Sequence, residues 1–323
     1  MSILQRIFGI RAGASEVDPI IDRVVAATDP RLSLVKGYRE SLRAPVVAAR
    51  ERLRQAVARI PGPTETSATA WSRDDTVRAL FAKGSDIAAV VSNDAGACTF
   101  FAAHPGADSC IAMLALEKRE RRVLASALHG DNVQAEVART TVSFAEPLIL
   151  APGMDHDAVR AELVVRGLEF LSLRALQRVG SMRSRKLELE KERALITAQL
   201  RLATARGTGF GALDSGAPKA GLERELERVV RELEAAASRR LLPTLLEEII
   251  RSLEEPGESI TVEPCGFALD AMNFVAPPGA PGTAIPLIAV LRLAHRGPFG
   301  VVIARFPRTE LKAAASFADA RFI

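Results

Sequence analysis

Residues 181–200 read SMRSRKLELEKERALITAQL, the most regular stretch of the chain. Eight of its twenty residues are charged, with both signs present, and neither Gly nor Pro interrupts it. The helical pattern extends back to Asp155-His156-Asp157, where acidic residues suit a helix N-terminus, and forward to about Arg206. At the rise of an α-helix, roughly 50 residues span about 75 Å. The stretch therefore predicts one long charged helix in the middle of the chain.

A second helix is predicted from Leu222 to about Leu253, after a Gly-rich loop at 207–221, with Pro243 as a kink or a new start. Its first half carries apolar residues at alternating four- and three-residue steps, typical of a heptad seam: Leu222, Leu226, Val229, Leu233 and Ala236.

The two arms carry opposite net charge. Residues 160–206 hold eleven Arg and Lys against five Glu, a net of +6, and residues 222–255 hold nine Glu against six Arg, a net of −3. Each surface pair contributes only a few tenths of a kcal/mol, but the asymmetry favours pairing of the two arms. We therefore predict an antiparallel helical hairpin, a coiled coil.

The seam of the first arm is imperfect. Its heptad phase runs through Val179, Met182, Leu189, Ile196 and Leu200, but two intervening core positions fall on Lys186 and Arg193. Either these side chains lie just off the seam and reach water, or the outer half of the hairpin needs another copy or another protein. The second interpretation gives the candidate partner-binding residues, which are Met182, Lys186, Leu189, Arg193, Ile196, Leu226, Val229 and Leu233.

The chain before this hairpin is predicted to be helical and then extended. Residues 31–60 have an amphipathic helical pattern that ends at Pro61-Gly62-Pro63, with Pro45 starting or kinking its regular part. Residues 72–75 offer caps to a short helix, and two more short helices are expected. Three strands of an antiparallel meander are then predicted at 110–116, 123–128 and 140–144, with a charged turn at 118–121.

The last quarter returns to strands, at 259–263, 267–275, 285–293 and 300–306, with a turn at 295–298 and a terminal helix at 308–318. The predicted fold class is α+β, with antiparallel β segments interrupted by the helical hairpin. The expected regions are an N-terminal helical region (1–106), a β meander (107–153), the hairpin (154–256) and a C-terminal β region with a terminal helix (257–323).

Composition narrows the class of protein. Hydrophobic residues make up 48% of the 323, enough for a substantial core. Three Cys without a CxxC spacing argue against a disulfide framework and a structural zinc site, and fit a reducing compartment. The start, MSILQRIFGIRAG, lacks the pattern of a signal peptide, and the longest strongly apolar run, 285–291, is too short to cross a bilayer. A cytoplasmic protein with no transmembrane segment is expected.

Two motifs that resemble nucleotide-binding and serine-enzyme signatures lack the surrounding sequence that these signatures require. GTGFG at 207–211 follows a helix, whereas a dinucleotide fingerprint follows a strand. Ser33 and Lys36 have the SxxK spacing without the SDN or KTG that accompanies it.

The sequence also gives only weak support for a catalytic cysteine or a metal site. Cys98, with His104 and His129 nearby in sequence, is more typical of a small buried thiol than of a nucleophile. Asp155-His156-Asp157 is better explained by helix capping than by metal binding. No catalytic residue, cofactor or metal is therefore predicted, although an unfamiliar enzyme with a pocket between sheet and helices stays an alternative.

Basic residues leave a second alternative. Arg183, Arg185 and Lys186 form the densest basic patch, and 31–59 is also rich in Arg. Both could track an anionic surface, nucleic acid or membrane, although no aromatic residue interleaves for base stacking. Residues 1–10 could lie in a membrane interface or dock on the helical region. The leading hypothesis is a non-catalytic scaffold or adaptor that engages a protein partner, or itself, through the hairpin.

Overall fold

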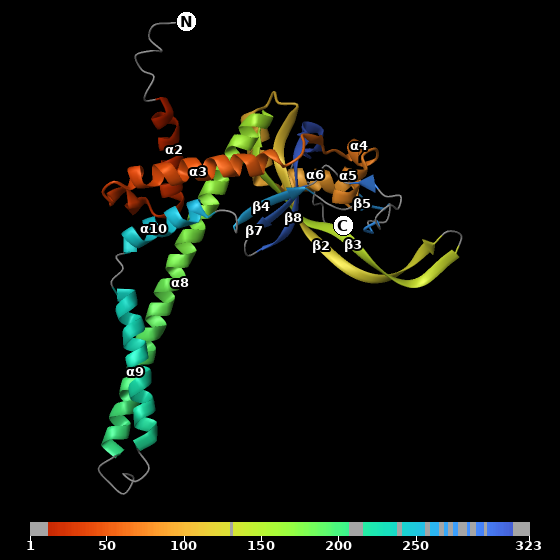
Figure 1. The fold of residues 1–323 in the computed structure, drawn as a ribbon. Helices are drawn as coiled ribbons and strands as arrows, with labels where there is room; N and C mark the ends of the chain where they lie inside the picture. The colour runs from red at the N-terminus through yellow and green to blue at the C-terminus, as the bar shows by residue number, and fades with distance from the viewer. Residues whose placement is uncertain are drawn as a thin grey trace, which may run out of the picture. The chain divides into compact units, whose positions relative to one another are not determined.

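The computed structural model describes residues 12–129, 132–206, 216–237, 241–255, 259–264, 268–270, 274–276, 283–284, 289–293 and 296–312. The fold is α+β, and along the chain a long helical hairpin comes between two groups of strands, as predicted (Figure 1). Two compact units form, each from two parts of the chain. The helical unit comprises Met1–Ala48 and Glu169–Glu254, and the sheet unit comprises Ala49–Leu168 and Glu255–Ile323. The segment 1–10, Cys265 and the predicted terminal helix beyond residue 312 lie outside the described residues.

The helical unit begins with α2 (Ala12–Thr28), a 3-10 turn (Pro30–Leu34) and the first part of α3 (Tyr38–Ala58). The helix predicted for 31–60 thus starts later, at Tyr38, and continues through Pro45. Fully buried apolar side chains from these elements and from the later helices form the core of the unit: Ile21, Val24, Leu42, Val46, Leu171 and Ile249.

The predicted hairpin is present, with one difference in its second arm. The first arm belongs to α8 (His156–Arg206), and the Asp155 carboxylate caps its start by accepting from the Ala158 amide at 3.0 Å. The second arm is two helices, α9 (Gly216–Ala237) and α10 (Leu241–Glu254), and α10 begins two residues before Pro243. Pro is tolerated in the first turn of a helix, where its missing N–H has no partner to lose, so Pro243 marks a new start.

The sheet unit is built on six described strands: β1 (Thr64–Glu65), β2 (Ser109–His129), β3 (Asn132–Gly153), β4 (Ile260–Pro264), β7 (Ala289–Leu293) and β8 (Arg296–Pro307). Their order is β3-β2-β8-β7-β4, all antiparallel, and β1 adds to β8 in parallel, with Thr64 beside Ala304. Strands from both sides of the hairpin in sequence therefore share one sheet.

The predicted meander is wrong. Residues 118–121 are no turn, because β2 runs unbroken from Ser109 to His129 and pairs along its length with β3. Charged side chains in a strand cost little when each one contacts water or an opposite charge. Lys118 and Glu120, two apart on one face, pair at 2.6 Å, and Arg119 reaches Glu117 and Glu146. A charged run in a long exposed hairpin therefore resembles a turn in sequence.

Four short helices cover one face of the sheet: α4 (Ala68–Trp71), α5 (Asp75–Leu80), α6 (Gly84–Asn93) and α7 (Ala95–Ala103). Asp74 caps α5, as the sequence predicted for 72–75, and Asp94 caps α7. Phe100 and Phe101 of α7 pack with Leu114 and Phe306 of the sheet. This region is the main core of the sheet unit.

The C-terminal strands agree with the prediction where they are described. Residues 260–264 form β4, and 300–306 lie inside β8. Of 267–275, only part is described: β5 (Ala268–Leu269) pairs with β6 (Thr283–Ala284), and Phe274 bridges to Thr141 of β3. The turn expected at 295–298 is wrong for 296–298, because β8 begins at Arg296, which pairs with Leu293. The terminal helix predicted for 308–318 is wrong at its described start, because residues 308–310 form a 3-10 turn and Leu311 after it is extended.

Candidate functional site

The seam between α8 and α9 is narrow. Leu189 and Ile196 of α8 pack with Val229 and Leu233 of α9, and each is less than 8% exposed. Leu200, Leu222 and Leu226 flank this cluster and are only partly buried. Four of the candidate partner-binding residues therefore contact each other within the closed hairpin, and Leu226 lies at the edge of their cluster.

The two polar core positions stay at the edge of the seam. Arg193 is exposed, and Lys186 is half-buried with its Nζ 4.0 Å from the Glu190 carboxylate. This agrees with the interpretation in which both side chains lie just off the seam and reach water. They border a side groove of about 260 Å³, which Glu190, Val230, Leu233 and Glu234 complete. The arms therefore close incompletely where the heptad pattern is polar.

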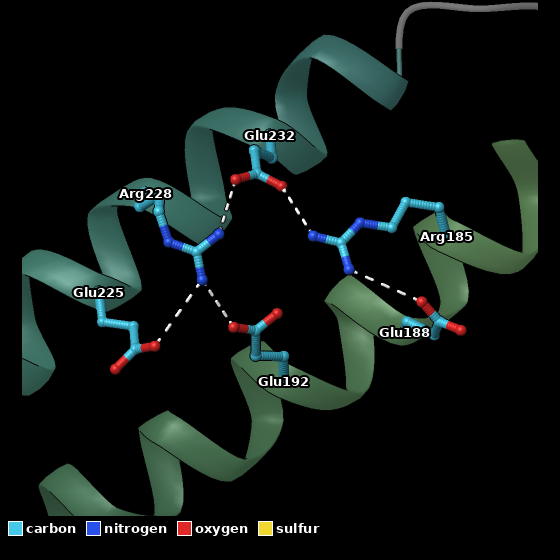
Figure 2. A network of polar contacts seen from close by, with 6 residues as sticks. All are labelled: Arg185, Glu188, Glu192, Glu225, Arg228 and Glu232. Carbon is cyan, nitrogen blue, oxygen red and sulfur yellow. Dashed lines mark hydrogen bonds and ion pairs between the residues drawn. The ribbon is translucent and has the colours of Figure 1, made fainter.

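A network of six charged residues crosses the two arms (Figure 2). Arg228 of α9 lies at its centre and donates to Glu192 of α8 and to Glu232 of α9, at 2.7 Å each. Arg185 of α8 pairs with Glu232 at 3.4 Å and with Glu188 at 3.6 Å, and Glu225 lies 3.7 Å from Arg228. Along α8 the contacts advance from 185 to 192 while along α9 they retreat from 232 to 228, so the arms are antiparallel.

The network shifts the pKa values of Glu232 and Arg228. The hydrogen bond from Arg228 lowers the pKa of the Glu232 carboxyl, with smaller contributions from Arg185. The same hydrogen bond raises the pKa of the Arg228 guanidinium. Arg185–Glu232, and Arg178–Glu248 on α10, follow the predicted sense, basic first arm to acidic second arm, while Arg228–Glu192 runs the other way. Net charge alone therefore does not decide which residues pair.

A larger groove, here called the junction groove, lies in the helical unit where α9 ends and α10 begins. Its volume is about 830 Å³. Apolar side chains from α8 and α10 line it: Val179, Met182, Leu187, Leu189 and Leu241. Charged side chains also line it: Arg183, Arg185, Lys186, Glu190 and Glu232.

The junction groove brings together most of the candidate residues from the start of the first arm. Met182, Lys186 and Leu189 of the partner-binding set meet Arg183 and Arg185 of the basic patch. Sequence reasoning missed Leu187 and Leu241. Leu187 is 53% exposed and lies off the heptad phase of the seam. A search for apolar residues on every face of the helix, and not only along the seam, would have found it.

An arginine clamp holds α10 against α8 beside this groove. Arg178 of α8 donates to the carboxylate of Glu248 at 3.1 Å and contacts the hydroxyl of Ser252. Glu248 is buried and also pairs with Arg251 at 2.8 Å. A buried carboxylate needs such partners, so the clamp fixes one wall of the groove.

The basic patch is partly neutralised by neighbouring carboxylates. Arg185 pairs with Glu188 and Glu232, and Lys186 approaches Glu190. In the Arg-rich stretch at 31–59, Arg39 pairs with Asp22 and Arg43 with Asp18. Such pairing weakens the field that an anionic surface would experience.

The residues weighed for catalysis are held by backbone contacts. The Cys98 thiol donates to the Ser92 carbonyl at 3.3 Å, while His104 Nδ1 lies 2.9 Å from the Phe100 carbonyl. Burial raises the pKa of the Cys110 thiol to about 11, which keeps it protonated and unreactive at neutral pH. The side chain of His129 lies outside the described residues.

His156 accepts from Arg160 at 2.8 Å, so this part of Asp155-His156-Asp157 serves the helix start. Over the described ranges, no group of three or more His, Cys, Asp or Glu side chains is arranged to hold a metal ion.

Comparison of the chain with protein-family models, curated proteins and solved structures gives no significant match. In the part of the chain that the structure describes, no helix combines the length and the apolar character needed to cross a membrane.

Proposed function

We propose that the chain is a non-catalytic cytoplasmic scaffold or adaptor that engages a protein partner, or a second copy, through the helical hairpin. The observation that carries the proposal is the junction groove, an apolar hollow that the chain's own described side chains leave open. A hollow of this composition favours binding, because covering apolar surface releases about 25 cal/mol per Å².

The groove has the properties of a site for side-chain anchors. Its volume of about 830 Å³ can accept several large side chains of a partner. Met182 and Leu187 are 36% and 53% exposed on its wall, so apolar contact area is available there. The flanking Arg183, Arg185 and Lys186 favour a partner that places acidic residues beside its apolar anchors.

The position of the groove supports an adaptor role. It lies at the junction of three helices, and the clamp of Arg178 on Glu248 fixes α10 against α8 there. A partner helix laid in such a groove would bury its apolar stripe against a surface that is already formed, which lowers the entropy cost of binding.

Removal of the hairpin tests the proposal. Because Arg185 contacts Glu232, Met182 and Ala236 lie at nearly one level of the antiparallel arms, and a short Gly-Ser linker can replace 183–235. Affinity capture from the native cells should recover a protein with the full chain and lose it with the shortened chain. An unchanged set of bound proteins and an unchanged mass by light scattering would overturn the proposal.

Point variants locate the surface without removing it. Met182→Glu with Leu241→Glu places two charges in the junction groove and should abolish capture. The matched control is Leu34→Glu, which changes a 77% exposed leucine of the same unit outside the groove. Equal capture by the groove variant and the control would place the binding surface elsewhere.

A further inference from the structure

A second apolar surface follows α8 on the side opposite the seam, and we call it the outer face. Residues two apart on a helix lie roughly 160° apart around its axis. Leu187 and Leu189 are such a pair, as are Leu173 and Ala175, and in each pair the later residue is buried while the earlier is exposed. The outer face continues at three- and four-residue steps through Leu173, Leu176, Gly180, Ser184, Leu187, Lys191, Ala194 and Ala198.

The leucines of this face are open to solvent. Leu173, Leu176 and Leu187 are 41%, 36% and 53% exposed, and Leu195, beside the stripe, is 61% exposed. A methyl group added at Gly180 would meet nothing within 4 Å, so the helix surface is bare there. An α-helix that has one apolar stripe in its seam and a second one exposed to water can bind another helix through the second stripe.

We propose that this neighbour is the outer face of a second copy, antiparallel to the first, with the two-fold axis passing between Arg185 and Lys186. In an isologous interface, residue i of one copy meets residue j of the other and j meets i. This axis sets Leu187 against Ser184, Leu173 against Ala198 and Lys191 against Gly180. At each of these levels a large side chain faces a small one, so the two surfaces interdigitate.

Charge supports the same arrangement. Flanking the central levels, Arg183 of one copy lies near Glu190 of the other, and the symmetry repeats the pair. No carboxylate of the described residues pairs with Arg183, and Glu190 has only Lys186, at 4.0 Å. Both groups are therefore available for a contact between copies.

A parallel pairing of the same faces fits poorly. In register, it would set Lys191 against Lys191 and Gly180 against Gly180, which combines repulsion with a gap. It would also pair Arg183 with Glu188, which already lies 3.6 Å from Arg185. The antiparallel arrangement is therefore the one that size and charge both favour.

This inference rests on the proposed function, because it names a second copy as a partner of the hairpin. Arg183 and Glu190 also line the junction groove, whereas Ser184 does not, so Ser184→Arg separates the two tests. Sedimentation equilibrium on the full chain should show a dimer. Arg183→Glu or Glu190→Arg alone should weaken dimerisation by about tenfold or more, because each change creates two repulsive contacts. The double variant Arg183→Glu with Glu190→Arg should restore it, since the pair is re-formed with its signs exchanged.

Two controls make the experiment specific. Arg193→Glu has the same change of charge on the seam side of α8 and should leave dimerisation unaltered. Ser184→Arg fills the small position opposite Leu187 without touching the junction groove, and should dissociate the dimer. Circular dichroism checks that each variant keeps its helix content.

Each outcome decides the inference. Rescue by the double variant supports the antiparallel dimer. A monomeric full chain, rescue by Arg183→Glu with Glu188→Arg instead, or a dimer indifferent to Ser184→Arg would overturn it. If the chain is monomeric yet still captures another protein through the junction groove, the dimer fails while the proposed function stands.

Discussion

The molecule contains two long hairpins, one of helices and one of strands, and they are stabilised in different ways. The helices α8 and α9 satisfy their backbone hydrogen bonds within themselves, and the arms meet through a small apolar cluster and exposed ion pairs. The strands β2 and β3 satisfy theirs between strands, with each other from Ile111–Gly153 to His129–Asn132 and, at the start of β2, also with β8. An opened helical hairpin keeps its secondary structure, whereas an opened strand hairpin loses it.

The two hairpins also differ in how their roots are held. At the root of the strand hairpin, residues 110–116 are all buried, and β8 pairs along β2 from Ser109 to Glu117. Beyond Glu117 the strand has only β3 as a neighbour among the described strands, and Leu124 is 70% exposed. The helical hairpin is held at its root by the Arg178–Glu248 clamp and by the buried side chains of α10. Backbone pairing with β8 therefore holds the root of the strand hairpin, and side-chain contacts hold the root of the helical hairpin.

The largest expected effect comes from the backbone packing of the sheet unit. Gly62 has a φ of +121°, and a Cβ there would lie 2.2 Å from the Ile303 carbonyl oxygen. Gly62→Ala should therefore lower the free energy of unfolding by about 3 kcal/mol or more. Chemical denaturation followed by circular dichroism measures it. Gly106→Ala, where nothing lies within 4 Å, is the matched control, and equal midpoints for the two variants would contradict the account.

The next effect concerns the root of the helical hairpin. Arg178→Ala removes one partner of the buried Glu248 carboxylate and leaves Arg251 as the other. We expect a loss of about 2–4 kcal/mol, because an under-paired buried charge is costly. Arg166→Ala, which breaks the exposed pair with Glu162, should cost only a few tenths of a kcal/mol in the same assay. A similar loss in both variants would show that the clamp does not hold the root.

A smaller effect is expected at the seam. Val229→Ala removes two methyl groups from a fully buried position and should cost about 1–2 kcal/mol. Because α8 and α9 satisfy their own backbones, the loss should appear as faster hydrogen exchange in the hairpin, with the sheet unaffected. The neighbouring Val230→Ala is the control, since Val230 borders the side groove and is only half-buried. Uniformly faster exchange across the sheet would contradict a locally stabilised hairpin.

The same difference explains what the sequence predicted well. Helical periodicity is local, so the bounds of α8 and the phase of its seam through Leu189 and Ile196 could be predicted from the sequence. The polar positions Lys186 and Arg193 marked where the arms close incompletely.

Strand pairing is not local, and the strand boundaries predicted from the sequence were wrong there. The charged run at 118–121 resembles a turn, and only the partner strand shows that it lies within β2. The sequence also did not predict two backbone irregularities of β3. Glu146 and Ala151 have positive φ beside shifts in the β2–β3 register. The junction groove also needed the structure, because Leu241 joins Met182 in its lining only through the turn between α9 and α10.

The smallest expected effect is the acid dependence of the charged network across the helical arms. The hydrogen bond from Arg228 lowers the pKa of Glu232 in the folded state. The stabilisation that this hydrogen bond gives the folded state is therefore fully present above the ordinary Glu pKa of about 4.3. It is lost as the pH falls through the lower pKa of Glu232 in the folded state. Glu232→Gln should consequently lower the melting temperature slightly at neutral pH and have no such effect in strong acid. The difference at neutral pH should also shrink as salt is added, because the network is exposed.

Glu227→Gln is the control for that titration, since Glu227 is an exposed residue of α9 outside the network. It should show neither the acid nor the salt dependence beyond the general effect of removing one negative charge. If both variants respond alike, the ion pairs add nothing specific, and the small apolar seam alone joins the arms. If only Glu232→Gln responds, the ion pairs supplement that seam, and β2 and β3, which join through their backbones, have no need of such a supplement.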